Sequence, residues 1–346
     1  MQTIERKFYI DTLTILSCIS VVFLHANGVF WSHPSGRLWL TSNLIECIFY
    51  FAVPVFFMIS GATLLEYRKR YDTNTYLKKR VRRTLIPFVA WSIIGFSIHF
   101  LILKKIPSIS DVIQLPLDII NCKYFGVYWF FIPLFTCYLS IIYLSRLIQF
   151  KKIIVFLIIW ISFSTSIIPF LNNLFGWRIN ETLMTVPPGG GYILYILLGF
   201  FLSQIKFAKF TRYLVYLCGL VGFLLHFLGT WYLGLEPTKP INMLFKGYLN
   251  FPSVLFSIAI FTLIKHNPLI FIYNSRIFTP FVLKIKENSL GIYLIHAYFL
   301  YYIFPKISLL NTSSIYYRLL SPFFVIFFCI IVCDIIRKIP FLKRII

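Results

Sequence analysis

A basic cluster with arginines at helical spacing is the first feature of this sequence that suits ligand binding. Eight cations lie between Arg68 and Arg83, and five of them fall in the run from Lys78 to Arg83. Guanidinium groups bind phosphate through paired hydrogen bonds, and Arg80 and Arg83 share a face if a helix begins before them. Lys79, Arg80 and Arg83 are therefore candidate contacts to a phosphate-rich ligand. The alternative is a cluster that only sets membrane topology and contacts anionic lipid.

His25 is the second candidate, because it lies within a strongly apolar segment. An imidazole titrates near neutral pH, so His25 can remove a proton from a hydroxyl group as a general base. Glu46 falls at a similar depth in the next apolar segment, and a carboxylate there can orient the imidazole. The alternatives are a structural histidine in a helix bundle and a glutamate that only reaches the membrane interface.

Four further residues are possible site residues because polar groups at membrane depth are costly and often functional. Asp11 shares a helical face with His25 but lies about 21 Å away along the axis, so the two cannot pair directly. Ser60, beside Gly61, lets a bound group or a neighbouring helix approach closely. Trp129 falls near a membrane boundary, and His296 lies in a later apolar segment.

The composition is that of an integral membrane protein. The 346 residues are 59% hydrophobic and only 13% charged, whereas a soluble domain has about a quarter charged residues. The net charge of +22 suggests nucleic acid in a soluble protein, but here the positive-inside bias accounts for most of it, so nucleic-acid binding is not expected. The seven cysteines form no CxxC pair, which favours buried thiols over a disulfide or zinc framework, and no metal is expected.

An all-α bundle of about ten transmembrane helices is the predicted fold class, with residues 1–346 forming a single domain and no soluble domain appended. With a cytoplasmic N-terminus, 24 of the 33 Lys and Arg residues fall in inner segments, which predicts that both termini are cytoplasmic. Each span is an apolar segment near the length of about 20 residues that crosses a bilayer. The spans lie near 8–30, 42–66, 84–104, 125–147, 152–171, 190–205, 211–233, 247–265, 285–305 and 319–336.

Two details within this topology bear on the site. Pro54 should kink the second span, because proline removes a helical hydrogen bond. The longest outer loops are 105–124 and 172–189, and the second ends in Pro187-Pro188-Gly189-Gly190-Gly191. That run is not regular helix, so it either lines an entrance or forms a turn into the next span.

Several of these segments, in this order, resemble the acyltransferase 3 family of membrane proteins. Together they cover residues 8 to about 305. They are Tyr9-Ile10-Asp11 followed by His25; Val53-Pro54-Val55-Phe56-Phe57 with Ser60-Gly61; Lys79-Arg80 with Arg83, Ile86-Pro87 and Trp91; Trp129-Phe130; and Gly291-Ile292-Tyr293-Leu294-Ile295-His296.

The resemblance implies a ten-helix O-acyltransferase of the bacterial cytoplasmic membrane. Such an enzyme moves an acyl group, most often acetyl from cytoplasmic acetyl-CoA, to a hydroxyl of a cell-surface polysaccharide or a lipid-linked sugar. His25 matches the family histidine, and Arg80 and Arg83 match the Arg-x-x-Arg element associated with acyl-CoA. Thr14 stands where the family has an arginine, and Val127 where it often has a histidine.

From the resemblance and the residues together, we expect acyl transfer to oxygen. His25 would act as general base or carry the acyl group transiently, Glu46 would orient it, and Lys79, Arg80 and Arg83 would bind the donor phosphates. The alternatives are a multi-span transporter of a lipid-linked sugar or small molecule, and a membrane scaffold without chemistry, which the loss of arginine at position 14 allows. Transporters often carry inverted repeats, and the sequence shows no clear second copy of the His25 or Val53–Gly61 patterns.

Overall fold

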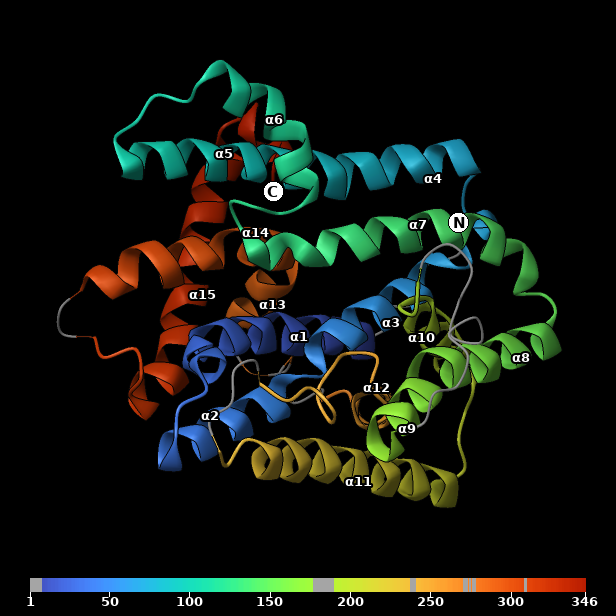
Figure 1. The fold of residues 1–346 in the computed structure, drawn as a ribbon. Helices are drawn as coiled ribbons and strands as arrows, with labels where there is room; N and C mark the ends of the chain where they lie inside the picture. The colour runs from blue at the N-terminus through green and yellow to red at the C-terminus, as the bar shows by residue number, and fades with distance from the viewer. Residues whose placement is uncertain are drawn as a thin grey trace.

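The computed structural model describes residues 8–176, 190–236, 241–269, 273, 275, 278–307 and 310–346. Within these ranges every regular element is a helix, so the predicted all-α class is confirmed (Figure 1). The helices are α1 (Phe8–Ala26), α2 (Gly36–Phe49), α3 (Ala52–Leu64), α4 (Thr73–Arg80), α5 (Ile86–Leu103), α6 (Ile109–Ile120), α7 (Phe131–Leu147), α8 (Lys151–Ser162), α9 (Ile168–Phe175), α10 (Ile193–Gln204), α11 (Lys209–Leu233), α12 (Phe251–His266), α13 (Phe278–Glu287), α14 (Ser289–Tyr298) and α15 (Ile315–Lys338).

Seven helical stretches in the described residues are long and apolar enough to cross a membrane, which identifies a membrane protein. The predicted spans near 190–205 and 247–265 appear as α10 and α12, which are apolar but only 12 and 16 residues long. The span near 285–305 is divided among α13, α14 and the π-helical segment Phe299–Ile303. The count of ten spans and the side of each terminus therefore remain predictions. The seven longer stretches are Phe8–Ala26, Gly36–Lys69, Thr73–Leu103, Gly126–Leu147, Lys151–Phe175, Lys209–Leu233 and Ile315–Lys338.

The second span breaks where its proline predicts. α2 ends at Phe49 and α3 begins at Ala52, so the break falls at Tyr50 and Phe51. The ring of Pro54 collides with the carbonyl of the residue four positions earlier, which is Tyr50, and the proline has no N–H to bond it. This break separates the Glu46 side chain on α2 from the close-packed α3 segment.

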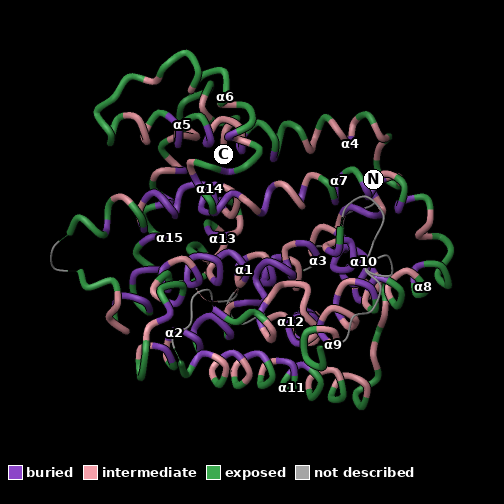
Figure 2. The backbone as a smooth tube through the Cα atoms, in the orientation of Figure 1, coloured by how far each residue is buried: buried purple, intermediate pink, exposed green. Residues whose placement is uncertain are grey.

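α1 is the central helix of the bundle, and it contacts α2, α3, α12, α13, α14 and α15. Figure 2 shows buried residues concentrated along α1, α3 and α14, while α6 and much of α11 are exposed. α3 packs against α10 through paired glycines. A Cβ at Gly61 would overlap the backbone of Ile196, and one at Gly199 would overlap the backbone of Met58. Close helix packing therefore accounts for Gly61, as small residues do at other membrane interfaces.

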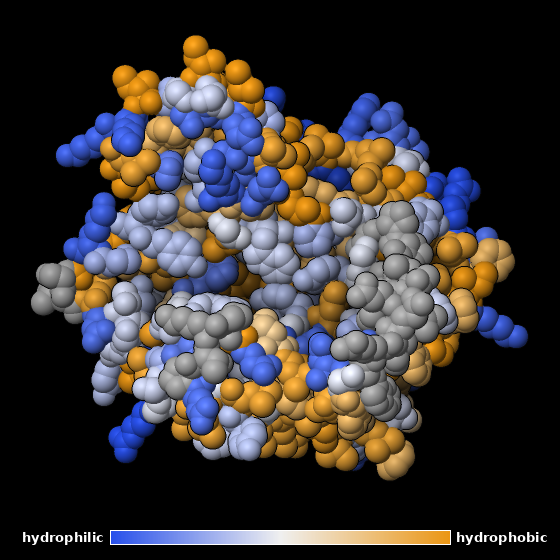
Figure 3. Space-filling view, in the orientation of Figure 1, coloured by the Kyte–Doolittle hydropathy of each residue, from blue (hydrophilic) through white to orange (hydrophobic). Residues whose placement is uncertain are grey.

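The surface carries the signature of a lipid-facing bundle. Hydrophobic residues cover broad areas of the face in Figure 3, and hydrophilic residues gather around α4 at the upper right. α11 and α15 carry many exposed leucines and phenylalanines. Lipid solvates such residues, whereas water would not.

The segment 105–124 was expected to be a loop, but it contains the helix α6. Ser108 caps its first turn in a capping box with Asp111, a local signal that favours a helix. Asp118 near its end accepts hydrogen bonds from Lys123 at 2.9 Å and from the Tyr124 hydroxyl at 2.8 Å. The hydrogen bond from Lys123 has the larger effect, and together the two bonds hold the pKa of the Asp118 carboxyl below its usual range. The Pro187-Pro188-Gly189 part of the other long loop lies outside the described residues.

Candidate functional site

His25 and His296 form a hydrogen-bonded pair at the end of α1. The Nδ1 atom of His25 lies 2.6 Å from Nε2 of His296, and the two rings are nearly parallel at 7°. The Nδ1 atom of His296 lies 3.0 Å from the carbonyl oxygen of Ile292. These two bonds join α1 to α14 across 271 residues of sequence.

The hydrogen bonds assign the proton on each ring. A carbonyl oxygen only accepts, so His296 donates from Nδ1 to Ile292, and its Nε2 is then an acceptor in the neutral ring. His25 must therefore donate from Nδ1 to His296, a tautomer inferred from the bonding pattern. That tautomer leaves the lone pair of His25 on Nε2. His25 is thus oriented as a base, with His296 in the orienting position that a carboxylate occupies in other catalytic groups.

His25 lines a cavity of about 590 Å³ that is rich in aromatic side chains. Trp129, Tyr248 and Tyr50 form a continuous stack, with ring centroids 5.5 Å and 4.3 Å apart. Glu46 also lines this cavity. Flat apolar faces beside a base and a carboxylate suit a ligand that has both apolar faces and hydroxyl groups. The described lining residues are Leu24, His25, Trp31, Glu46, Tyr50, Gly126, Val127, Trp129, Tyr192, Met243, Gly247, Tyr248 and Tyr301.

Glu46 bonds Lys246 rather than His25, which differs from the sequence-based expectation. Its Oε1 atom accepts a hydrogen bond from Lys246 Nζ at 3.1 Å, and both side chains are almost fully buried. The Lys246 ammonium also lies 3.9 Å from the centre of the Tyr50 ring, a cation–π geometry. A buried ammonium needs a countercharge, and Glu46 supplies it. In the structure, the hydrogen-bond partner of His25 is therefore His296 rather than Glu46.

A second buried cation, Arg318, extends this network. Its guanidinium donates to Asn27 Oδ1 at 3.2 Å and to Thr41 Oγ1 at 2.9 Å, and Asn27 Nδ2 lies 3.5 Å from Glu46. Sequence reasoning passed over Arg318 and Lys246. One feature of the sequence could have identified both residues. The predicted topology places them on the outer side of the membrane, where the positive-inside pattern leaves few cations.

The basic cluster forms one wall of a cleft of about 950 Å³ near the opposite end of α1. Lys79 and Arg83, two of the candidate phosphate contacts, line it, and the start of α14 and the C-terminal residues complete it. Cations predominate, with one acid, Glu287, among the described lining residues. The cations are Lys79, Arg82, Arg83, Arg337, Lys343 and Arg344.

Arg80 does not lie with Arg83 in this cleft, although its spacing suggested it. Its guanidinium packs over the rings of Tyr76 and Tyr138, 5.8 Å and 5.4 Å from their centres, and Arg82 is among the described lining residues instead. The reason is the π-helical segment Val81–Leu85, whose i to i+5 hydrogen bonds widen the turn and change which residues share a face.

A small cavity of about 150 Å³ adjoins the basic cleft. It shares Thr84, Ser289 and Leu290 with the basic cleft, and Ser60 and Tyr293 also line it. The Tyr293 ring lies 5.7 Å from the His296 ring. The small cavity thus connects the lining of the basic cleft to the histidine pair.

Two remaining sequence positions lie apart from this chemistry. Asp11 accepts from Lys286 Nζ at 2.9 Å, which ties α1 to α13. Thr14, at the position of the family arginine, donates to the carbonyl of Ile10 at 2.8 Å, one turn earlier. No group of three or more His, Cys, Asp or Glu in the described ranges is arranged to hold a metal ion.

Comparison with known proteins places the chain in a family. No curated protein and no solved structure matches the chain. However, the sequence model of a protein family described as an acyltransferase domain matches residues 7–338, which is nearly the whole length of the chain. The chain therefore belongs to the acyltransferase 3 family.

Proposed function

We propose that this membrane acyltransferase moves an acetyl group from acetyl-CoA to a sugar hydroxyl of a cell-envelope glycan or lipid-linked sugar. The observation that carries the proposal is the His25–His296 pair, because it leaves the Nε2 lone pair of His25 beside an aromatic cavity. Stacked rings and a carboxylate suit a sugar, whose ring has both apolar faces and hydroxyl groups.

His25 acts as a general base in this proposal. The acceptor hydroxyl oxygen attacks the thioester carbonyl while its proton passes to Nε2 of His25. The carbon–sulfur bond then breaks, and the proton on His25 passes to the departing sulfur. The bond from His25 Nδ1 to His296 strengthens while His25 is an imidazolium, since charge-assisted hydrogen bonds are stronger than neutral ones.

The basic cleft holds the donor. Lys79, Arg82 and Arg83 supply cations for the phosphates of the CoA nucleotide, and Arg337, Lys343 and Arg344 add more from the C-terminal side. The thin pantetheine arm enters the small cavity past Ser60 and Tyr293 toward the histidine pair. Arg80 packs on the rings of Tyr76 and Tyr138 and so stabilises the helical segment that carries Arg82 and Arg83.

We also propose that the basic cleft faces the cytoplasm of a bacterial cell and the aromatic cavity faces outward. Cations concentrate at the cytoplasmic side of membrane proteins, and CoA thioesters are made in the cytoplasm. Donor and acceptor would then approach the histidines from opposite sides of the membrane. Both termini are cytoplasmic in this orientation.

The direct test uses purified protein in lipid nanodiscs with radiolabelled acetyl-CoA and an envelope-glycan extract. His25→Ala should reduce label transfer to the glycan to background, and His99→Ala, on α5 outside the cavities, should leave it unchanged. Normal transfer by the His25→Ala protein would exclude this mechanism. In sealed proteoliposomes, movement of the glycan across the bilayer without any label transfer by the unaltered protein would favour the transporter alternative.

A further inference from the structure

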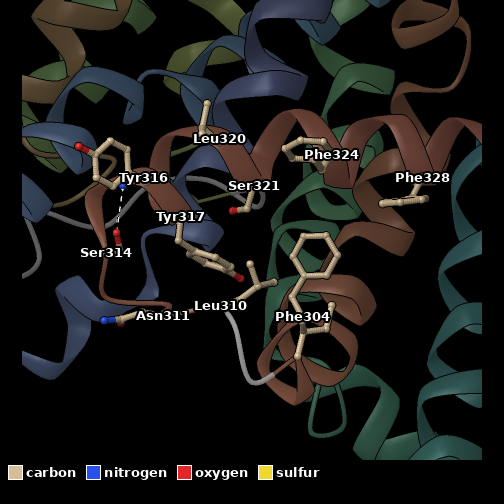
Figure 4. A pocket seen from close by; sticks show the side chains of 11 residues that line it. Phe304, Leu310, Asn311, Ser314, Tyr316, Tyr317, Leu320, Ser321, Phe324 and Phe328 are labelled. Carbon is tan, nitrogen blue, oxygen red and sulfur yellow. Dashed lines mark hydrogen bonds between the residues drawn. The ribbon is translucent and has the colours of Figure 1, made fainter.

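An apolar groove of about 430 Å³ follows one face of α15 (Figure 4). Tyr317, Leu320, Ser321, Phe324 and Phe328 lie on that face at helical spacing. Figure 4 shows the ring of Phe304 and the side chain of Leu310 opposite them, so the groove lies between the helix and the segment that precedes it. Leu320 and Phe324 are more than half exposed, which places the groove on the lipid-facing surface.

The groove changes from polar to apolar along its length. Asn311 and Ser314 lie at the beginning of α15, where Ser314 Oγ accepts from the Tyr316 N–H at 3.3 Å. Phe324 and Phe328 lie about three and four turns further along the helix. A guest that fits both ends is an amphiphile, with a polar group at the first end and a hydrocarbon chain along the phenylalanines.

The same chain segment borders the groove and the His25 cavity. Tyr301 lines the cavity, and Phe304 and Ile307, a few residues later, line the groove. Arg318, on the first turn of α15, donates to Asn27 Oδ1, and Asn27 Nδ2 lies 3.5 Å from Glu46 of the cavity. The polar end of the groove is therefore next to the site where the acceptor hydroxyl must bind.

Charge in the segment that borders the groove favours an anionic headgroup. Lys306 is exposed and lies in sequence between Phe304 and Ile307. The described residues that line the groove include neither Asp nor Glu. A phosphate linking a hydrocarbon chain to a sugar would find a cation there without an opposing carboxylate.

We propose that this groove binds the hydrocarbon chain of a lipid-linked sugar, so that the acceptor is acylated while it is still attached to its membrane lipid. The phosphate of that lipid lies near Lys306, and its sugar reaches His25 past Tyr301. One groove along one helix face accommodates one chain, which favours a polyprenyl phosphate over a two-chain phospholipid. This inference rests on the proposed function and narrows its acceptor to the lipid-linked form.

Photo-crosslinking in nanodiscs tests where the lipid binds. The probe is a polyprenyl phosphate with a diazirine in its chain, and mass spectrometry locates the labelled peptide. Labelling should fall on residues 316–328, and unlabelled polyprenyl phosphate should compete with it, whereas the same excess of phosphatidylglycerol should not. Equal competition by phosphatidylglycerol would show a bulk-lipid contact, and either that result or the absence of label on this peptide would overturn the proposal.

A matched pair of variants separates the groove from the rest of the lipid-facing surface. Leu320→Trp fills the groove, and Leu220→Trp on α11 is the control, because the two leucines are 53% and 52% exposed. Leu320→Trp should reduce crosslinking roughly ten-fold, about 1.4 kcal/mol of binding free energy. It should reduce glycan acylation as well, while acetyl-CoA binding stays unchanged. Leu220→Trp should alter none of these.

Comparison with His25→Ala distinguishes the two proposals. If His25→Ala abolishes acylation but Leu320→Trp changes neither crosslinking nor acylation, the groove assignment is wrong and the proposed function stands. If His25→Ala acylates normally, the proposed function fails, and the acceptor role of the groove fails with it even where the lipid crosslinks.

Discussion

Charge is arranged differently in the basic cleft and in the His25 cavity. In the cleft, several cations stand near one another, and Arg82 and Arg83 are exposed to solvent. Around the cavity, charged side chains are few and paired: Glu46 and Lys246 are buried together, and the half-buried His25 bonds His296. The cleft can hold phosphate with any of several side chains, whereas the cavity depends on single contacts.

The free-energy consequences follow from exposure. An exposed cation gains little from any one contact, because water and salt screen it. A buried group that loses its partner is left desolvated and unpaired, which costs far more. Single substitutions should therefore have large effects near His25 and small ones near Arg83.

The largest expected effect is on the buried pair of Lys246 and Glu46. Lys246→Met removes the ammonium and leaves the Glu46 carboxylate buried without a countercharge, so the free energy of unfolding should fall by about 3–5 kcal/mol. Thermal unfolding of the purified protein measures this. The double variant Lys246→Met with Glu46→Gln should recover much of the loss, because it leaves no unpaired charge. A double variant as unstable as the single one would show that Lys246 stabilises the fold by packing rather than by charge.

The next largest effect is expected for His296→Ala, which removes the acceptor of the hydrogen bond from His25 Nδ1. Without the acceptor, the His25 ring loses its fixed tautomer, and kcat should fall about 10²-fold while KM for acetyl-CoA stays unchanged. His296→Gln should retain more activity, because its amide oxygen can accept from His25 Nδ1. An equal loss in both variants, or a change confined to KM, would contradict a positioning role for His296.

These two contacts mark what the sequence alone could not predict. Local patterns were sufficient for the helical class and for the break before Pro54, and they singled out His25, whose role as a base stays a prediction. The partners were not predictable, because His296 is 271 residues from His25 and Lys246 is 200 residues from Glu46. Such pairs depend on which helices pack together, and periodicity along one chain segment carries no information about that.

The basic cluster shows a second, more local limit. A regular helix puts residues three apart on one face, which led to the pairing of Arg80 with Arg83. The π-helical segment Val81–Leu85 changes which residues share a face, and Arg82 rather than Arg80 lines the cleft. Composition singled out the cluster, whose role in donor binding stays a proposal, but one irregular turn decided which arginines line the cleft.

The cleft should respond to substitution less than the cavity does. Arg82→Ala with Arg83→Ala should raise KM for acetyl-CoA about ten-fold, because other cations remain, and kcat should change little. Added salt should weaken donor binding in the unaltered protein and have less effect in the double variant. Arg80→Ala is the comparison, and we expect it to lower stability rather than to raise KM. A larger rise in KM from Arg80→Ala than from the double change would restore Arg80 as the donor contact.

The smallest effect is expected for an exposed ion pair. Lys284 donates to Asp334 at 2.8 Å, with the two side chains 46% and 36% exposed. Lys284→Ala should lower the free energy of unfolding by no more than about 1 kcal/mol, and high salt should remove most of the difference. Thermal unfolding of the Lys284→Ala and Lys246→Met proteins compares the two losses in stability directly, because each substitution removes one lysine from one ion pair. Equal losses in the two variants would show that burial does not separate them, and the distinction between the two kinds of charge would then fail.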